Sequence, residues 1–333
     1  MKKLILTALP LTLAITACQR PGDEFREALP HRSDVTVAFP EDTAQSSQGL
    51  SRQALVGEPA GYYTTTYYEA RKINGFGAFV VNLVETITAY PPTTLDADVA
   101  TWGPFSDDRE PNEFRLTVER RDAPALHYLW YLEGRPKSAT DYTGLAGGAF
   151  EPSAVPDQGR GWFGVSFDNI RTLDPTEDGA GQIAYAFAKD DEGLAVQVVF
   201  QGLDATGAVA TAGYLFGQRT TGEGFVSFAF PGDINDGDPT MPAQEDILLL
   251  SRWTASGAGR ADIIATNGDL GTQALYGAQC WNDTFVSTFE AIVLDENILS
   301  AQGDPTSCRL GELQPESLPD AESLVNPYAE ELE

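Results

Sequence analysis

The chain has 333 residues, of which 42% are hydrophobic and 10% aromatic, so it can build a large packed core and is not an intrinsically disordered protein. Its 49 acidic residues outnumber 21 basic ones, and the formal charge of −28 excludes nucleic acid and anionic lipid headgroups as electrostatically favoured partners. Such a surface is compatible with divalent cations or basic partners, although its simplest reading is solubility.

The first residues have the layout of a secretory signal. Lys2 and Lys3 form a positive start, and an apolar run over residues 4–16 follows them. This run is shorter than the roughly 20 apolar residues of a transmembrane helix, and it contains Pro10. We therefore expect residues 1–17 to be a signal peptide.

The next four residues, Ile15-Thr16-Ala17-Cys18, resemble the lipobox of bacterial lipoproteins. The resemblance implies cleavage before Cys18, acylation of that cysteine (palmitate among its acyl chains) and anchoring of the chain to a membrane. Gln19, in the place where Asp would retain the protein, implies sorting to the outer membrane, on its periplasmic or cell-surface side. The alternative is an ordinary signal peptide with a chance cysteine near its end.

Composition divides the rest of the chain into three parts. Residues 18–60 are rich in Pro, Gly, Ser, Gln and charge without a sustained apolar period, which predicts a lipidated flexible tether. Residues 61–310 are expected to form a β-rich globular domain. Residues 311–333 are rich in proline and glutamate, which predicts an acidic tail that is loosely docked or disordered.

One helix is expected, over about residues 75–89. Asn74 is a candidate N-cap, and Pro91-Pro92 would end the helix. The apolar residues recur at intervals of three and four, as a helix packed on a sheet requires: Phe76, Phe79, Val80, Leu83, Val84 and Ile87. A buried strand is the alternative, because Gly75 and Gly77 weaken the first turn and the segment contains several valines.

Most of the domain alternates with period two and therefore predicts strands. Residues 182–187 and 194–200 flank the turn 190–193 as a hairpin, and residues 114–118 and 126–132 form a second hairpin. Further strands are expected at 162–167, 209–216, 224–230, 247–253, 261–266 and 274–280, with Asn267-Gly268 as the strongest turn signal.

About ten such strands with short links predict a mainly β fold, an antiparallel meander. We expect this sheet to curl into a half-barrel or barrel with the helix packed on it, and a sandwich is the alternative. A transmembrane barrel is disfavoured, because residues 259–266 are small or polar on both faces and a lipid anchor would be redundant.

Two cysteines, Cys280 and Cys308, remain once Cys18 is assigned to lipid. An even number in an exported chain predicts a disulfide, with a chain-entropy contribution of roughly 3 to 4 kcal/mol. The rival interpretation, a pair of metal-binding thiolates, lacks the close Cys-x-x-Cys spacing and a neighbouring histidine.

Motifs for catalysis are weak, so we expect no enzyme. After the signal, the histidines are His31 in the expected tether and His127 in an expected strand, where it would face solvent or a polar interior. The sequence Gly164-Val165-Ser166-Phe167 lacks the closing glycine of a nucleophile elbow and is expected to lie within a strand. Phosphate-binding loops of the known patterns are missing from the sequence.

One acidic stretch, residues 233–238, is a candidate Ca²⁺ site with oxygen ligands from Asp233, Asn235, Asp236 and Asp238. It departs from an EF-hand loop, since Gly237 occupies the third ligand position and Gln244 the twelfth. A solvated turn between strands is the alternative, and otherwise no cofactor is expected.

Three short stretches are similar to segments of Gram-negative envelope lipoproteins that have no assigned activity: Pro91-Pro92-Thr93-Thr94, Thr101-Trp102-Gly103-Pro104 and Gln279-Cys280-Trp281-Asn282. The first functional hypothesis is accordingly a membrane-anchored, non-catalytic protein with a structural or adhesive role and an envelope protein partner, which predicts no deep apolar pocket. The second is a carrier of a lipid or other apolar ligand, similar in outline to half-barrel lipoprotein carriers, with a pocket lined by Phe, Trp and Tyr. The third is a hydrolase with two converging carboxylates.

Overall fold

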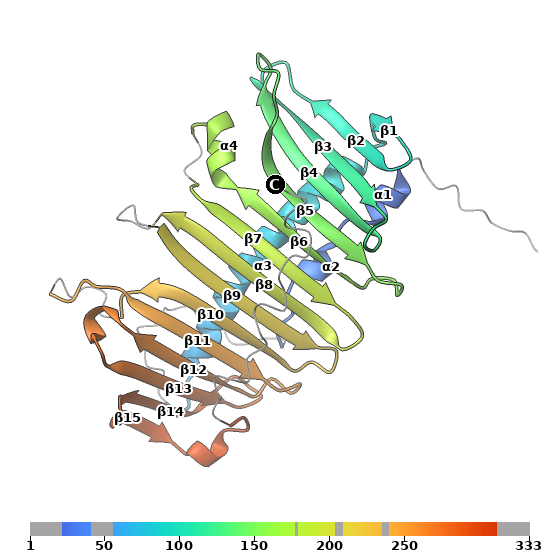
Figure 1. Cartoon of the computed structure of the whole chain (residues 1–333). Helices are drawn as coiled ribbons and strands as arrows, with labels where there is room; N and C mark the ends of the chain where they lie inside the picture. The colour runs from blue at the N-terminus through green and yellow to red at the C-terminus, as the bar shows by residue number, and fades with distance from the viewer. Residues whose placement is uncertain (1–21, 41–55, 177–178, 204–208, 235–239, 312–333) are drawn as a thin grey trace, which may run out of the picture.

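The computed structural model describes residues 22–40, 56–176, 179–203, 209–234 and 240–311. Within these ranges fifteen strands form one antiparallel sheet, ordered β1 to β15 as in the chain (Figure 1). The strands are β1 (Thr94–Leu95), β2 (Val99–Phe105), β3 (Asn112–Arg121), β4 (His127–Pro136), β5 (Thr143–Pro152), β6 (Gly159–Ser166), β7 (Gln182–Lys189), β8 (Gly193–Leu203), β9 (Val209–Arg219), β10 (Gly224–Gly232), β11 (Glu245–Trp253), β12 (Gly259–Thr266), β13 (Ala274–Trp281), β14 (Ser287–Leu294) and β15 (Asn297–Gly303).

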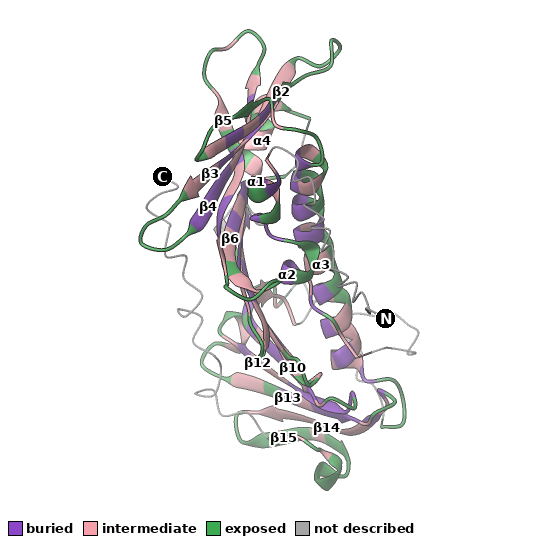
Figure 2. Ribbon diagram, turned by 90° about the vertical axis from the view of Figure 1, so that its right-hand side faces the viewer, coloured by how far each residue is buried: buried purple, intermediate pink, exposed green. Residues whose placement is uncertain are grey.

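The helices are α1 (Asp23–Glu27), α2 (Arg32–Val35), α3 (Gly61–Thr88) and α4 (Phe167–Leu173), with short 3₁₀ turns η1 (Gly268–Leu270) and η2 (Pro305–Ser307). Helices α1, α2 and α3 lie on one face of the sheet, which we call the helix face (Figure 2). No helix within the described ranges combines the length and apolarity needed to cross a membrane.

The mainly β meander is confirmed, and so are both predicted hairpins, as β3–β4 and β7–β8. The prediction of a half-barrel or barrel is wrong in its curvature, because the sheet is neither closed nor strongly curled and β1 and β15 lie at its two ends (Figure 1). Helix α3 gives a physical reason. Its 28 residues make a rod about 42 Å long that lies across the strands (Figure 1), so successive strands pack on it in a row and do not curl into a ring.

Helix α3 crosses nearly the whole sheet. At its start, the Tyr62 amide donates to Gln279 Oε1 on β13 (2.9 Å), and just beyond its end the Tyr90 carbonyl accepts from Trp102 Nε1 on β2 (2.8 Å). The helix begins at Gly61 rather than near residue 75, because its first half presents aromatic and threonine side chains that do not read as a simple apolar stripe. Asn74 is not an N-cap but exchanges hydrogen bonds with both backbone groups of Val37.

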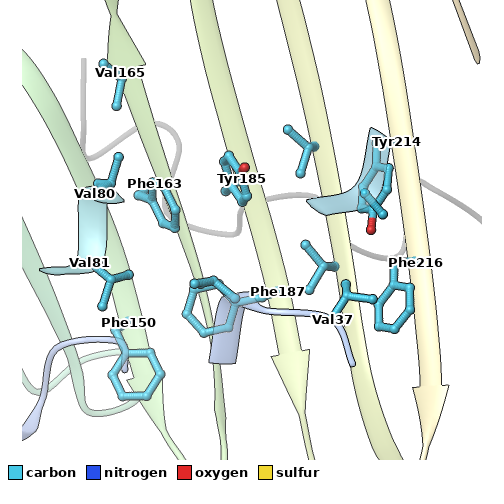
Figure 3. Packing of buried hydrophobic residues seen from close by; sticks show 14 of the residues in the cluster. Val37, Val80, Val81, Phe150, Phe163, Val165, Tyr185, Phe187, Tyr214 and Phe216 are labelled. Atoms are coloured by element: carbon cyan, nitrogen blue, oxygen red, sulfur yellow. The ribbon is translucent and has the colours of Figure 1, made fainter. Parts of the chain in front are cut away.

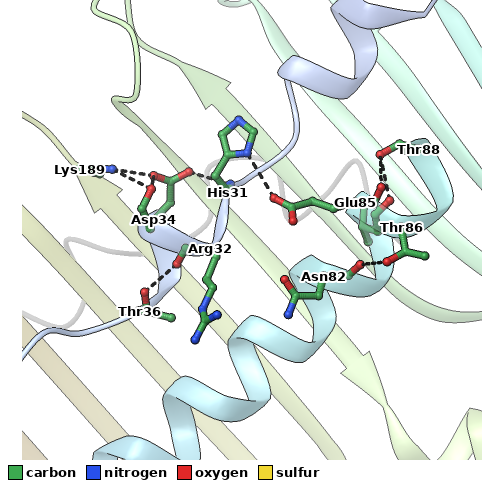
Figure 4. A network of polar contacts seen from close by, with 11 residues as sticks. His31, Arg32, Asp34, Thr36, Asn82, Glu85, Thr86, Thr88 and Lys189 are labelled. Atoms are coloured by element: carbon green, nitrogen blue, oxygen red, sulfur yellow. Dashed lines mark hydrogen bonds and ion pairs between the residues drawn. The ribbon is translucent and has the colours of Figure 1, made fainter. Parts of the chain in front are cut away.

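The predicted tether, residues 18–60, is described over residues 22–40 and 56–60. Residues 22–40 pack on the sheet beside α3, with Phe25, Leu29 and Val35 almost completely buried. Figure 4 shows α2 beside α3, where Asp34 accepts from Lys189 Nζ at the end of β7 (3.0 Å). The apolar residues of this segment are too few to form a recognisable period, but most of them are buried.

The hydrophobic core lies between the helices and the sheet. It is filled by every second residue of the strands, whose side chains all point to the helix face. Figure 3 shows part of this packing, in which Phe163 stacks on Tyr185 with 4.7 Å between the ring centroids. Near the far end of the sheet the predicted disulfide between Cys280 and Cys308 is confirmed, with the two Cα atoms 5.4 Å apart.

Candidate ligand-binding cleft

The two flanks of α3 differ on the helix face: one is covered by chain and the other is open. On one flank, residues 22–40 cover the sheet, and Phe39 packs against Tyr67, Phe216 and Trp253 with ring centroids 5.2 to 6.4 Å apart. On the other flank a cleft of about 660 Å³ lies between α3 and strands β7 to β11. The described side chains that line it are Thr65, Glu69, Lys72, Ile73 and Phe76 from α3, Phe167 from α4, and Ile183, Tyr185, Val198, Phe200, Ala212, Tyr214, Phe228, Phe230 and Leu249 from the sheet.

Strand register creates the floor of the cleft. One row of aligned residues runs across five strands, from Tyr185 through Val198, Tyr214 and Phe228 to Leu249. Because side chains alternate along a strand, all five point to the helix face. The cleft therefore follows from the same period-two pattern that predicts the strands.

A small residue opens the neighbouring row. There Ile183 pairs with Phe200, and Phe200 pairs with Ala212 on β9. Two residues further along β9, Tyr214 is buried, whereas Ala212 is only partly buried and contributes a single methyl group to the wall. The missing side-chain volume at Ala212 leaves space that the larger neighbours do not fill.

Helix α3 approaches the sheet closely beside the cleft. A Cβ on Gly77 would lie 3.0 Å from Tyr185 Cε1, so a larger residue would have to push the Tyr185 ring aside by a few tenths of an ångström. The approach lets the Tyr185 hydroxyl donate to the Ile73 carbonyl at 2.7 Å. Burial raises the pKa of Tyr185 above its ordinary value, so this hydroxyl keeps its proton and its hydrogen bond to the Ile73 carbonyl.

Polar groups at the cleft are few. Lys72 Nζ and Glu69 Oε1 pair at 2.6 Å on the solvent side, where both side chains are substantially exposed. Tyr214 is 4% exposed, and its hydroxyl has no hydrogen-bond partner among the described residues. Burial and the neighbouring Tyr185 raise the pKa of Tyr214 well above its ordinary value, so it remains a neutral donor.

These groups can bind an apolar molecule and offer little for bond-making chemistry. Among the described lining residues there is no histidine or cysteine, and the one carboxylate, Glu69, is engaged by Lys72. A second hollow of about 680 Å³ lies at the opposite ends of the same strands. Its lining includes apolar side chains such as Phe225 and Trp253, but it is more polar than the cleft because four charged side chains also line it: Asp190, Glu192, Arg219 and Glu223. The cleft beside α3 is thus the stronger candidate for an apolar ligand.

The predicted cation site lies mostly outside the described residues. Asn235, Asp236 and Asp238 are not among them, and Asp233 follows β10 in the loop beyond Phe230. The described part of the chain contains no group of three or more potential metal ligands from His, Cys, Asp and Glu. Cys18, the predicted lipidation site, also lies outside the described ranges.

His127 and Ser166, the two weak candidates for catalysis, both have structural roles. His127, expected to face solvent or a polar interior, is fully buried, and its Nδ1 lies 2.9 Å from the Ala125 carbonyl oxygen. Ser166 is the last residue of β6, but it stands at a strand-to-helix junction that was not expected. It caps α4, where its hydroxyl accepts from the Asn169 amide at 3.2 Å. Neither residue lines the cleft.

Sequence reasoning missed the cleft as a set of residues. The available signal was the alternation of large apolar residues, aliphatic or aromatic, along β7, β8 and β10, and the alanine at position 212, which faces the same side on β9. No protein-family model, curated protein or solved structure matches this chain.

Proposed function

We propose that this protein binds a lipid or another apolar small molecule in the cleft between α3 and strands β7 to β11. The observation that carries the proposal is the cleft itself, which has a volume typical of ligand sites and walls made almost entirely of aliphatic and aromatic side chains. Apolar surface left open to water costs free energy in proportion to its area, so an apolar occupant would be stabilised there.

The resemblance of residues 15–18 to a lipobox supports a location of this binding activity at a membrane. With Cys18 acylated, the protein would be an outer-membrane-anchored carrier or binding module on the periplasmic or cell-surface side. Its negative charge would keep the domain off anionic headgroups while the anchor holds it nearby. A purely structural or adhesive role is the less favoured function, because it gives no reason for an open aromatic cleft.

Binding can be tested with a neutral apolar dye, N-phenyl-1-naphthylamine, whose fluorescence rises in apolar sites. The protein would be the Cys18→Ser chain, purified from the host envelope and freed of co-purifying lipid. We expect saturable binding of one dye per chain. Native mass spectrometry before the lipid is removed should also find apolar adducts.

A pair of variants on β9 makes this test specific. Ala212→Trp places a large ring in the cleft and should weaken dye binding at least about tenfold, since the occupied volume excludes the ligand. Thr211→Trp is the control, because residue 211 is exposed and its side chain points to the opposite face. The proposal fails if wild type does not saturate or if both variants bind like wild type while circular dichroism shows them folded.

A further inference from the structure

We propose that the ligand of the cleft carries an uncharged hydrogen-bond acceptor, such as a ketone or ester oxygen, and that the Tyr214 hydroxyl recognises it. The inference rests on the proposed function and names the class of ligand. It depends on one feature, the buried Tyr214 hydroxyl, which has no hydrogen-bond partner among the described residues.

Tyr214 is the unusual polar group of the cleft. Buried hydroxyl groups in proteins are nearly always paired, because losing hydrogen bonds to water without replacement is costly. Several described side chains have a buried polar atom without a partner, and Tyr214 is the one among them that is also a lining residue of the cleft. The Tyr214 oxygen itself is closed to solvent, so a ligand oxygen reaches it only when the side chains around it move aside. Its neighbours along the row, Val198 and Phe228, have no acceptor in their side chains.

Tyr185 provides an internal comparison. It lies in the same row, two strands away, and its hydroxyl finds the Ile73 carbonyl at 2.7 Å. The fold can therefore satisfy a tyrosine in this row with helix backbone. Tyr214 has no such partner, and its ring packs edge-on against Phe228 with 5.1 Å between centroids, a contact that phenylalanine would make equally well. Packing alone thus does not explain the hydroxyl.

The surroundings favour a neutral acceptor over an anionic one. A carboxylate beside Tyr214 would lose its hydration among apolar side chains, which is costly unless a cation compensates it. Lys72 is the one cation among the described lining residues, and it is paired with Glu69 on the solvent side. A ketone or ester oxygen can accept the Tyr214 proton without that cost.

The test compares ligands of equal chain length by displacement of N-phenyl-1-naphthylamine. Decane has no acceptor, 2-decanone has a neutral one, and decanoate at pH 8 is anionic. Wild type should bind 2-decanone about 2 to 13 times more tightly than decane, which corresponds to one hydrogen bond. Decanoate should bind more weakly than 2-decanone.

The Tyr214→Phe variant should bind decane at least as well as wild type and lose the preference for 2-decanone. Tyr276→Phe, at a partly exposed position outside the cleft, is the matched control and should keep that preference. A wild type without preference, a Tyr214→Phe variant that retains it, or tightest binding of decanoate would overturn the inference while leaving apolar binding intact. Absence of dye binding would instead contradict the proposed function.

Discussion

Glu290 on β14 is a buried carboxyl at the end of the sheet where α3 begins. It is hydrogen-bonded by Gln279, whose side-chain oxygen in turn accepts from the Tyr62 amide at the helix start. Desolvation raises the pKa of Glu290 above its ordinary value, and it also raises the pKa of Tyr62 to about 12, with a contribution from the Glu290 charge. This small network ties the first turn of α3 to β13 and β14.

The Glu290 shift has a predictable sign. Because its folded-state pKa is raised, the folded protein binds the proton more tightly than the unfolded chain, whose glutamates titrate near about 4.3. The resulting stability is fully present below that value and is lost as pH rises through the folded-state pKa. Glu290→Gln should remove this loss and be more stable than wild type at neutral pH, measured by urea unfolding between pH 4 and 8.

Glu296→Gln is the control for this experiment, since Glu296 lies in the exposed turn between β14 and β15. It should follow the wild-type pH profile. If Glu290→Gln also follows that profile, burial of the Glu290 charge does not affect folding.

At the scale of elements, helix α3 and the segment of residues 22–40 together cover the sheet. The segment is held by apolar contacts at both ends, Phe25 against Tyr128 on β4 and Phe39 against Trp253 on β11. Between them, Asn74 and Lys189 fix the backbone and side chains of residues 33–37 (Figure 4 shows the Lys189 contacts). The segment behaves as part of the domain.

Truncating Phe25 tests whether this docking contributes to stability. Phe25 is 3% exposed, so Phe25→Ala should lower the free energy of unfolding by about 3 to 5 kcal/mol through lost burial and the cavity left behind. Phe79 on α3 is 63% exposed, so Phe79→Ala should change the free energy of unfolding by less than about 0.5 kcal/mol. Both values come from chemical denaturation, and equal effects of the two substitutions would contradict the docked arrangement.

At the scale of the whole molecule, a single open sheet carries its helices on one face (Figure 2). Each strand pairs with the strand next to it in the chain, so local hairpins account for the topology. The covering layer is narrower than the sheet, and the cleft lies where that layer ends. An open, one-sided architecture therefore provides the binding site without a closed barrel.

The expected lipid anchor belongs to this scale, because it decides where the molecule works. Cys18→Ser should move the protein from the membrane fraction to the soluble fraction of a Gram-negative host, as its thiol is the acylation point that the lipobox implies. Thr16→Ser, which keeps a small residue before the cysteine, should remain with the membrane. Membrane retention of Cys18→Ser would show that another feature holds the chain there.

Local patterns in the sequence were sufficient for most of the strands and for the disulfide. Period-two alternation placed β7 and β8 correctly, because the side chains of a strand take alternate faces wherever the strand lies. The pairing of Cys280 with Cys308 followed from the assignment of Cys18 to lipid, which leaves two cysteines in an exported chain. Strands β1, β2, β5, β14 and β15 were missed. β1 has only two residues, glycine and proline interrupt β2 and β5, and most of β15 is exposed. β14 ends in four consecutive apolar residues, 291–294, which show no period of two.

Tertiary structure alone decided the curvature of the sheet, the docking of residues 22–40 and the cleft. Curvature depends on what the sheet packs against, and the straight α3 keeps it open. Docking depends on isolated residues such as Phe25 that form no period. The cleft requires Ile73, Ile183 and Ala212, far apart in sequence, to meet at one place. Periodicity reports which face a residue takes, whereas only long-range packing determines what covers that face.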